Sequence, residues 1–542
     1  MAFQELLDKA GGHGRFQVIQ LAFLLIVSTL SGTHNLLQNF TAAIPGHRCW
    51  VPLLDNETTF ANGTEMLDSD FLLSVSIPLD SNMSPEKCRR FRHPQWQLLR
   101  LNGTFSNMSE PDTEPCVDGW VYDPSIFPST IINEWNLVCE SQFLKSVAQF
   151  IFMIGGLLGS LIYGRLADRF GRKLMIRLCS LQLAVFGTCA AFAPTFPIYC
   201  SLLFLSGSSS TGTLINCGLL MTEWTVTKFK AVTLTLVNCA ASCAQILLGG
   251  LGLGIQNWRT LQLAVSMPFF VFFLFSRWLI ESARWLIVNN RSEEGLKALR
   301  EVARVNGIKK AGDVLTIESL RLTMQEELAA AQTRVSVCDL FRTPNMRLRT
   351  CILSLMRFVT SLSYYGIALN LQHLGNNIAL YQVVFGAVTL PARCIAFWAL
   401  NHIGRRISQL MFMFLSGLMI LLLIITFVTQ EMKTLRVILA ALGIFTVSAS
   451  SMTIVVLRSE LMPTVLRGTA VGVILVAGRI GGSIAPLMML LTVYMPHLPW
   501  IVYGVFPMLV SFSVFFFPET RHTPLPDTIQ DVENRRNAVL LY

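Results

Sequence analysis

Charged residues are scarce in this chain of 542 residues: Asp, Glu, Lys and Arg together make up 14%, against 52% hydrophobic residues. Soluble globular domains carry about 25% charged residues, so the composition excludes an ordinary soluble domain. The net charge is +9, but the basic residues lie at the ends of apolar runs and form no single basic and aromatic surface. We therefore expect no nucleic-acid partner and interpret the basic residues as signals of membrane topology.

Several catalytic and nucleotide-binding motifs are also missing. The sequence contains no Walker loop, no His-Glu-x-x-His motif and no Gly-x-Ser-x-Gly elbow. Cys239 and Cys243 are one helical turn apart, but no histidine or acid nearby completes a metal site. We therefore expect no enzyme, no ATP-driven machine, no cofactor and no bound metal.

Apolar windows of about 20 residues, the length that a helix needs to cross a bilayer core of roughly 30 Å, recur along the chain. They lie at 16–36, 146–165, 174–194, 198–221, 231–254, 258–279, 349–370, 378–400, 407–428, 434–456, 468–491 and 495–517. The sequence therefore predicts an all-α membrane protein whose partner is the lipid bilayer. Its twelve transmembrane helices form two six-helix halves, 16–279 and 348–517.

The charges between these windows predict the topology. The central stretch 280–347 is rich in lysine and arginine, which the positive-inside rule places in the cytoplasm. An even number of spans on either side then puts the amino terminus, 1–15, and the tail, 518–542, in the cytoplasm as well. No small-residue cleavage site follows the first apolar run, so we expect the first span to remain as an anchor.

Residues 40–144 form a long polar segment that this topology places outside the cell. Four of the 13 cysteines lie in or near it: Cys49, Cys88, Cys116 and Cys139. They predict two disulfides, with three pairings open. The same segment carries glycosylation sequons at Asn56, Asn62, Asn102 and Asn107. Cysteines and sequons thus agree on an extracellular loop.

Short motifs repeat between the halves at offsets of roughly 233 to 238 residues, as expected for a transporter with pseudo-twofold symmetry. The repeated positions are Gly171-Arg172-Lys173 with Gly404-Arg405-Arg406, Glu223 with Glu460, and Glu281 with Glu519. Such symmetry predicts a binding site between the halves.

The segment GRLADRFGRK at residues 164–173, between the second and third spans, resembles the signature loop of the major facilitator superfamily. We expect Asp168 to cap the start of a neighbouring helix and to pair with arginines when the inner gate is closed. The predicted gating residues are Gly164, Asp168, Arg169, Gly171, Arg172, Glu223, Gly404, Arg405, Glu460 and Arg467.

Further stretches resemble the solute carrier 22 family over nearly the whole chain, among them NFTAAIP at 39–45, DGWVYD at 118–123 and ESARW at 281–285. Met1-Ala-Phe and Tyr364-Tyr365-Gly366 resemble its organic anion transporters, particularly those for steroid conjugates. The resemblance implies a plasma-membrane carrier of organic anions that exchanges its substrate for a counter-anion. Steroid sulfates and glucuronides and carboxylates are the implied substrates.

Two arginines lie deep within predicted spans. Arg479 follows Arg467 by 12 residues and Arg393 precedes Arg405 by 12, so each lies roughly 18 Å along its helix from the inner boundary. An arginine at mid-membrane costs about 2.5–3.5 kcal/mol and is expected to face a cavity or a partner. We predict that both bind the substrate anion, and pairing with a buried acid is the alternative. The family resemblance agrees, since its cation carriers have an acid where Arg479 stands.

Five further residues are candidates for the same substrate site. Arg357 is one, although snorkelling to the interface is the favoured explanation for a cation so near a helix end. Tyr364 and Tyr365 resemble the family's cavity aromatics and offer both a ring face and a hydroxyl group. Asn35 and Gln245 are polar residues within spans, where polar groups tend to face a cavity or another helix.

Two positions depart from the family pattern. Leu203 stands where relatives usually carry an arginine, and Ala241 where some have a cavity tyrosine. Two other functions stay open beside anion transport, the first disfavoured by Arg479 and the second kept open by Leu203. One is a cation or zwitterion carrier of the same family, and the other is a non-transporting receptor or scaffold that retains the fold.

Overall fold

The computed structural model describes residues 2–12, 14–55, 69–80, 84–96, 112–125, 127–308, 316–332, 336–375, 377–428, 432–521, 526 and 528–533. It divides the chain into two compact units. The helical unit comprises residues 1–40, 146–255 and 259–542, and the loop unit comprises residues 41–145 and 256–258. The helical unit carries the candidate site.

Twelve helices among the described residues are long and apolar enough to cross a membrane, which confirms the predicted number. In the first half they are α2 (Arg15–Thr33), α7 (Phe143–Phe170), α8 (Arg172–Ala191), α9 (Phe196–Glu223), α10 (Thr227–Gly254), and α11 (Trp258–Ser266) continued by α12 (Pro268–Phe275). In the second half they are α18 (Pro344–Ala368), α19 (Ile378–His402), α20 (Arg405–Val428), α21 (Lys433–Leu461), α22 (Arg467–Met488) and α23 (Leu498–Ser511). Short 3₁₀ turns lie at Cys139–Ser141, Ser276–Trp278, Leu371–His373, Met489–Val493 and Phe512–Phe516.

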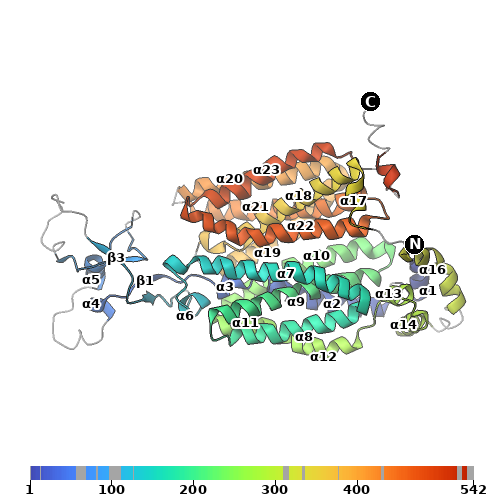
Figure 1. Cartoon of the computed structure of the whole chain (residues 1–542), viewed down its shortest axis with the longest axis horizontal. Helices are drawn as coiled ribbons and strands as arrows, with labels where there is room; N and C mark the ends of the chain where they lie inside the picture. The colour runs from blue at the N-terminus through green and yellow to red at the C-terminus, as the bar shows by residue number, and fades with distance from the viewer. Residues whose placement is uncertain are drawn as a thin grey trace. The chain divides into compact units, whose positions relative to one another are not determined.

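The two halves repeat one packing pattern, as the sequence repeats predict. Helix α8 packs on α9 and α12, and its counterpart α20 packs on α21 and α23. Likewise α2 packs on α9 and α10, and α18 packs on α21 and α22. Figure 1 shows the helices of the second half, yellow to red, as a bundle beside the blue-to-green bundle of the first. This is the fold of two pseudo-symmetric six-helix halves.

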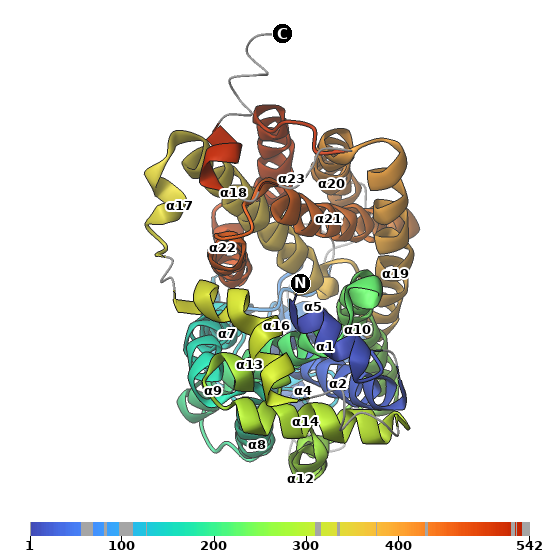
Figure 2. The same ribbon diagram turned by 90° about the vertical axis from the view of Figure 1, so that its right-hand side faces the viewer.

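Helices α10 and α19 join the halves along one flank, where Figure 2 shows them side by side. Close approach is possible because both helices carry glycine there. A Cβ atom on Gly249 would come within 2.9 Å of the Ala379 carbonyl oxygen, and one on Gly386 would come within 2.9 Å of the Ser242 carbonyl oxygen. The Thr389 hydroxyl also donates to the Ser242 Oγ at 2.7 Å.

A second junction lies where α2 leads into the loop unit. The Asn39 amide on α3 (Gln38–Thr41) donates to the Ala368 carbonyl oxygen at 2.6 Å and to the Gln382 Oε1 at 3.2 Å. Ala368 ends α18 and Gln382 lies in the first turns of α19. We call this end of the bundle the loop end and the opposite end the terminal end; these bonds hold the halves together at the loop end.

Short helices gather at the terminal end: α1 (Ala2–Lys9), α13 (Ala283–Val288), α14 (Ser292–Val305), α16 (Ile317–Gln332) and α17 (Asp339–Arg342). Asn306, directly after α14, ties them to the first span. Its side-chain amide donates to the carbonyl oxygens of Ala10 and Gly11 and to the Gln17 Oε1, at 3.0–3.1 Å. Its Oδ1 accepts from the Phe16 backbone N–H at 3.0 Å. Asn306 therefore fixes the entry of the chain into α2.

Replacing Asn306 by alanine is expected to lower the thermal stability of the purified protein. The change removes these bonds at once and leaves partly buried backbone groups unsatisfied, each at a cost of about 1–3 kcal/mol. Asn289→Ala is the matched control, because among the described residues the Asn289 amide bonds only to the Trp285 carbonyl of the helix that it caps. Equal melting temperatures for the two variants in detergent would contradict this role.

The loop unit is built from short elements and two disulfides. Strand β1 (His47–Cys49) pairs with β4 (Trp120–Tyr122), and β2 (Arg89–Phe91) pairs with β3 (Thr113–Pro115), both antiparallel. Helices α4 (Pro52–Asp55), α5 (Ser69–Ser76) and α6 (Ile131–Glu134) complete it. Bridges join Cys49 to Cys116 and Cys88 to Cys139. The predicted glycosylation sites Asn56, Asn62, Asn102 and Asn107 lie outside the described residues.

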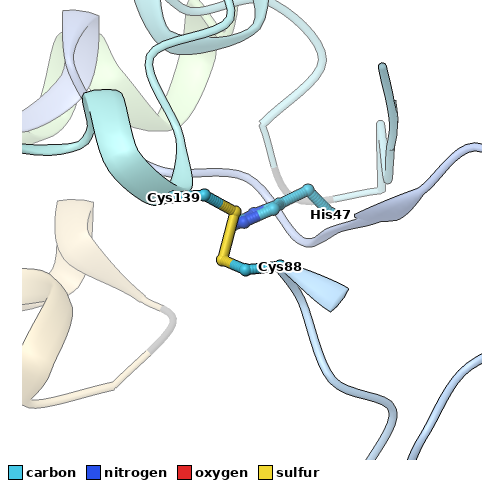
Figure 3. A group of neighbouring side chains, drawn as sticks. All are labelled: His47, Cys88 and Cys139. Atoms are coloured by element: carbon cyan, nitrogen blue, oxygen red, sulfur yellow. A yellow bond between two sulfur atoms is a disulfide. The ribbon is translucent and has the colours of Figure 1, made fainter. Parts of the chain in front are cut away.

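One disulfide lies beside a histidine. Figure 3 shows the His47 imidazole directed at the bond between Cys88 and Cys139, with the ligand atoms of the three residues within 4.8 Å of one another. Burial lowers the pKa of His47, whose Nδ1 lies 3.0 Å from the Pro45 carbonyl oxygen. Because both sulfurs are committed to the disulfide, the cluster offers no pair of thiolates to a metal ion.

Candidate functional site

A cavity of about 290 Å³ lies between the halves, with walls from α2, α9 and α10 on one side and α18, α19 and α21 on the other. This volume is close to the lower end of the range for small-molecule sites, roughly 300 Å³. Its lining residues are Ser28, Gly32, Asn35, Leu36, Leu214, Val237, Asn238, Ala240, Ala241, Gln245, Arg357, Ser361, Tyr364, Tyr365, Arg393, Ser448, Ser451, Met452 and Val455.

Two arginines supply the charge of this cavity. Arg357 on α18 donates from Nη1 to the Ser451 Oγ at 2.6 Å, while its buried Nε has no hydrogen-bond partner among the described residues. Arg393 on α19 donates to the Asn238 carbonyl oxygen on α10, across the two halves. Of the described residues that line the cavity, none is Asp or Glu. The cavity wall is therefore cationic without a compensating carboxylate.

Aromatic and amide groups stand next to these cations. The Gln245 amide on α10 donates to the Tyr364 hydroxyl on α18, a second polar link across the halves. The Tyr364 and Tyr365 rings are perpendicular, with centroids 5.3 Å apart. Asn35, two residues after the end of α2, is half-buried on the same wall. This arrangement presents both hydrogen-bonding groups and ring faces to a bound molecule.

Six of the seven predicted substrate residues thus line one cavity: Asn35, Gln245, Arg357, Tyr364, Tyr365 and Arg393. The expectation that Arg357 snorkels to the interface is wrong, because its side chain is held by Ser451 inside the bundle. Its stem lies flat on α22, where a Cβ atom on Gly478 would come within 2.8 Å of the Arg357 Cγ.

Arg479 does not line the cavity. It is half-buried on α22 and follows Gly478, the residue against which the Arg357 stem packs. The two positions that depart from the family pattern also differ in location. Leu203 is 4% exposed within the first half, whereas Ala241 lines the cavity. Only Ala241 therefore alters the wall that a substrate would meet.

Sequence reasoning missed the polar residues of α21 and α10 that complete the wall. Ser448 and Ser451 belong to a stripe on α21, and the Asn238 carbonyl oxygen on α10 receives Arg393. The serine spacing of three residues on one helical face was the available signal. The Asn238 contact had no such signal, because every residue has a backbone carbonyl and the sequence does not show which one accepts a hydrogen bond.

A charge cluster at the terminal end organises the signature loop. Arg172 pairs with Asp168 at 3.0 Å and with Glu223 at 3.3 Å, and its Nη1 donates to the Ala167 carbonyl oxygen at 3.0 Å. The Glu281 carboxylate accepts from the backbone N–H groups of Arg172 and Lys173, each at 3.0 Å. Glu281 therefore caps α8, and the Asp168 carboxylate pairs with Arg172. Capping by Asp168 in a state with a closed inner gate stays a prediction.

The second half carries the matching cluster. Arg405 pairs with Glu460 at 3.3 Å and donates to the Leu400 carbonyl oxygen at 2.9 Å. Glu519 caps α20 by accepting from the backbone N–H groups of Arg405 and Arg406, each at 3.1 Å. The predicted sequence repeat is thus also a repeat of hydrogen bonds.

The two capping carboxylates differ in their environment. Burial raises the pKa of Glu281 despite the backbone N–H donors around it. Burial also acts to raise the pKa of the more open Glu519, but there the backbone donors prevail and hold the pKa below its ordinary value. Burial therefore opposes the charged form of both caps but outweighs the backbone donors at Glu281 alone of the two.

The remaining predicted gating residues make other contacts than these ion pairs. The Arg169 guanidinium lies 5.3 Å from the centroid of the Phe170 ring. Arg467, at the start of α22, donates to the Met462 carbonyl oxygen at 3.4 Å. Gly164 has open space where a side chain would project, whereas Gly171 and Gly404 have positive φ angles of 99° and 109°.

Two six-helix halves around a shared central cavity, with matched charge clusters, define a membrane transporter of the major facilitator class. A family model described as "Sugar (and other) transporter" matches residues 102–530. The chain is 58% identical to human solute carrier family 22 member 10 over 99% of both chains. It is 57% identical to the rabbit (Oryctolagus cuniculus) "Steroid transmembrane transporter SLC22A24" over 98% of this chain and 96% of that protein. The chain therefore belongs to solute carrier family 22.

Solved structures show the same fold. A partially occluded, inward-open structure of the xylose transporter XylE from E. coli aligns with a TM-score of 0.61. The alignment covers 93% of this chain and 99% of that one, at 13% sequence identity. The relatives are named as transporters, and the chain is a transporter, not an enzyme.

Proposed function

We propose that this chain is a plasma-membrane carrier that moves organic anions, steroid sulfates and glucuronides and carboxylates among them, in exchange for a counter-anion. The observation that carries the proposal is a central cavity whose wall holds Arg357 and Arg393 and, among its described residues, no Asp or Glu. An organic cation would need a carboxylate there to offset its desolvation. The cavity therefore favours an anion over a cation.

In this proposal the two arginines hold the anionic group and the remaining wall receives the organic body. The unpaired Nε of Arg357 is a ready donor to a sulfate or carboxylate oxygen. Tyr364 and Tyr365 offer ring faces, and Leu36, Leu214 and Val237 are among the apolar lining residues that would contact a hydrocarbon skeleton. The printed name of the rabbit relative supports a steroid as that skeleton.

Alternating access would come from rocking of the two halves about the cavity. The bonds of Asn39 to Ala368 and Gln382 close the loop end in this conformation. We assign the loop end to the outside, with residues 40–144 extracellular and both termini cytoplasmic, on the positive-inside rule applied to 280–347. The charge clusters of Arg172 and Arg405 would then lie on the cytoplasmic side.

Uptake of radiolabelled estrone sulfate and of tetraethylammonium by cells expressing the chain tests the proposal, with surface biotinylation as the expression control. Saturable uptake of estrone sulfate alone is expected. Uptake of tetraethylammonium alone would show that the chain is a cation carrier of the same family and not an anion carrier. Surface expression with neither compound moving would favour the non-transporting alternative.

A further inference from the structure

Helix α21 presents a stripe of residues to the central cavity that extends beyond it. Ser448, Ser451, Met452 and Val455 line the cavity at helical spacings of three and four residues. Continuing the same stripe leads to Arg458, seven residues after Ser451, which is two helical turns or about 10 Å further along the axis. Arg458 therefore lies on the cavity side of α21, toward the terminal end.

Three arginines from three helices lie on or beside this stripe. Arg357 of α18 is bonded to Ser451 and lines the cavity. Arg458 of α21 lies two helical turns along the same stripe from Ser451. Arg479 of α22 follows Gly478, where an added Cβ would come within 2.8 Å of the Arg357 Cγ. We call Arg357, Arg458 and Arg479 the triple-arginine cluster.

The described residues give this cluster no counter-charge. Glu460, the acid nearest to Arg458 in sequence, pairs with Arg405 and accepts from the Thr520 hydroxyl at 2.5 Å. Neither Arg458 nor Arg479 forms an ion pair within the described part of the chain. Arg458 is half-buried, and the Arg357 Nε is buried without an acceptor.

Uncompensated guanidinium groups in a membrane bundle repel one another and are costly to desolvate. Such groups are found where they serve a ligand or an ion pathway. An oxyanion with several acceptor oxygens would satisfy the Arg357 Nε and offset the repulsion through charge-assisted hydrogen bonds. Carboxylate and sulfate groups have this chemistry.

We propose that the triple-arginine cluster is a second anion-binding station, located between the central cavity and the terminal end. It takes the sulfate or carboxylate group of an organic anion as it enters or leaves the cavity. Arg357 belongs to both stations, so an anion can pass from Arg458 to Arg357 and then to Arg393 without losing a cationic partner. The transport role of the station rests on the proposed function, whereas its occupation by an oxyanion does not.

Binding of inorganic sulfate tests the station directly. Purified full-length protein in detergent is heated in sodium sulfate and in sodium chloride at equal ionic strength. The unaltered chain is expected to melt at a higher temperature in sulfate, because a ligand that binds the folded state stabilises it. Arg458→Gln is expected to lose most of that gain. Arg436→Gln, on the same helix but bonded to the Thr426 carbonyl, should keep it.

The station would be overturned if sulfate did not raise the melting temperature of the unaltered chain, or if it raised that of Arg458→Gln by the same amount. A transport assay then links it to function: Arg458→Gln should raise the KM for efflux of preloaded estrone sulfate about tenfold, the loss expected for one charge-assisted hydrogen bond. The KM for uptake from the medium should change less. If the unaltered chain binds sulfate but moves no estrone sulfate, the proposed function fails and the station stands.

Discussion

Replacing Arg357 by alanine is expected to reduce estrone sulfate uptake at least about tenfold with unchanged surface expression. The substitution removes a cation from a cavity wall that, among its described residues, carries no acid. It also removes charge-assisted hydrogen bonds to the substrate, worth about 1.5–3 kcal/mol each, which corresponds to roughly a 10- to 100-fold loss. Initial uptake rates normalised to surface-biotinylated protein measure the effect.

Two further variants separate the cavity charge from other effects. Arg347→Ala is the matched control, since Arg347 is an exposed arginine on the same helix, ten residues before Arg357. It should transport normally. Arg357→Lys should recover part of the activity, because it keeps the charge but loses the planar fork of donors. Normal uptake by Arg357→Ala would remove this residue from the substrate site.

Replacing Gly171 by alanine is expected to remove most folded protein from the cell surface. The Gly171 φ angle of +99° is one that residues with a side chain rarely adopt. A Cβ atom there would also come within 2.3 Å of the Glu281 Oε2. The side chain would therefore displace the carboxylate that caps α8, adding the loss of a cap, about 1 kcal/mol, to the backbone strain. Surface biotinylation and thermal melting measure the outcome.

The same signature loop supplies the control for this variant. A Cβ atom on Gly164 would meet no atom within 4 Å, so Gly164→Ala should express at the normal level. Gly404→Ala should fall between the two, because its φ angle is +109° but its added Cβ would meet the Glu519 Oε2 at 3.0 Å. Normal surface levels for Gly171→Ala would show that the loop tolerates a side chain at this position and a displaced Glu281 carboxylate.

The spans were predictable because a bilayer imposes one length and one chemistry on every helix that crosses it. The window 378–400 corresponds to α19 (Ile378–His402), and 198–221 corresponds to α9 (Phe196–Glu223). The halves followed from repeated charges such as Glu281 and Glu519. The sheets of the loop unit had no comparable signal, since each pairs strands of only three residues that are distant in the chain.

The sequence predicted which residues form the candidate site better than it predicted the contacts that these residues make. Arg393 could be found from its depth within a span, because burying a cation there demands a reason. The same argument gave Arg479, which lies outside the cavity, since depth does not say which face of a helix a residue occupies. The role of Glu281 as the cap of α8, beside Asp168, could not be predicted for a related reason. The two acids are more than a hundred residues apart, and only the folded structure brings Glu281 to the start of α8.

The order of the disulfides in the loop unit has a mechanical consequence. The bridge from Cys49 to Cys116 and the bridge from Cys88 to Cys139 overlap in sequence. A single cut of the chain anywhere between Cys49 and Cys139 is therefore spanned by at least one covalent cross-link. Between Cys88 and Cys116 it is spanned by both. A protease that nicks this segment once would leave the first span tethered to the other eleven.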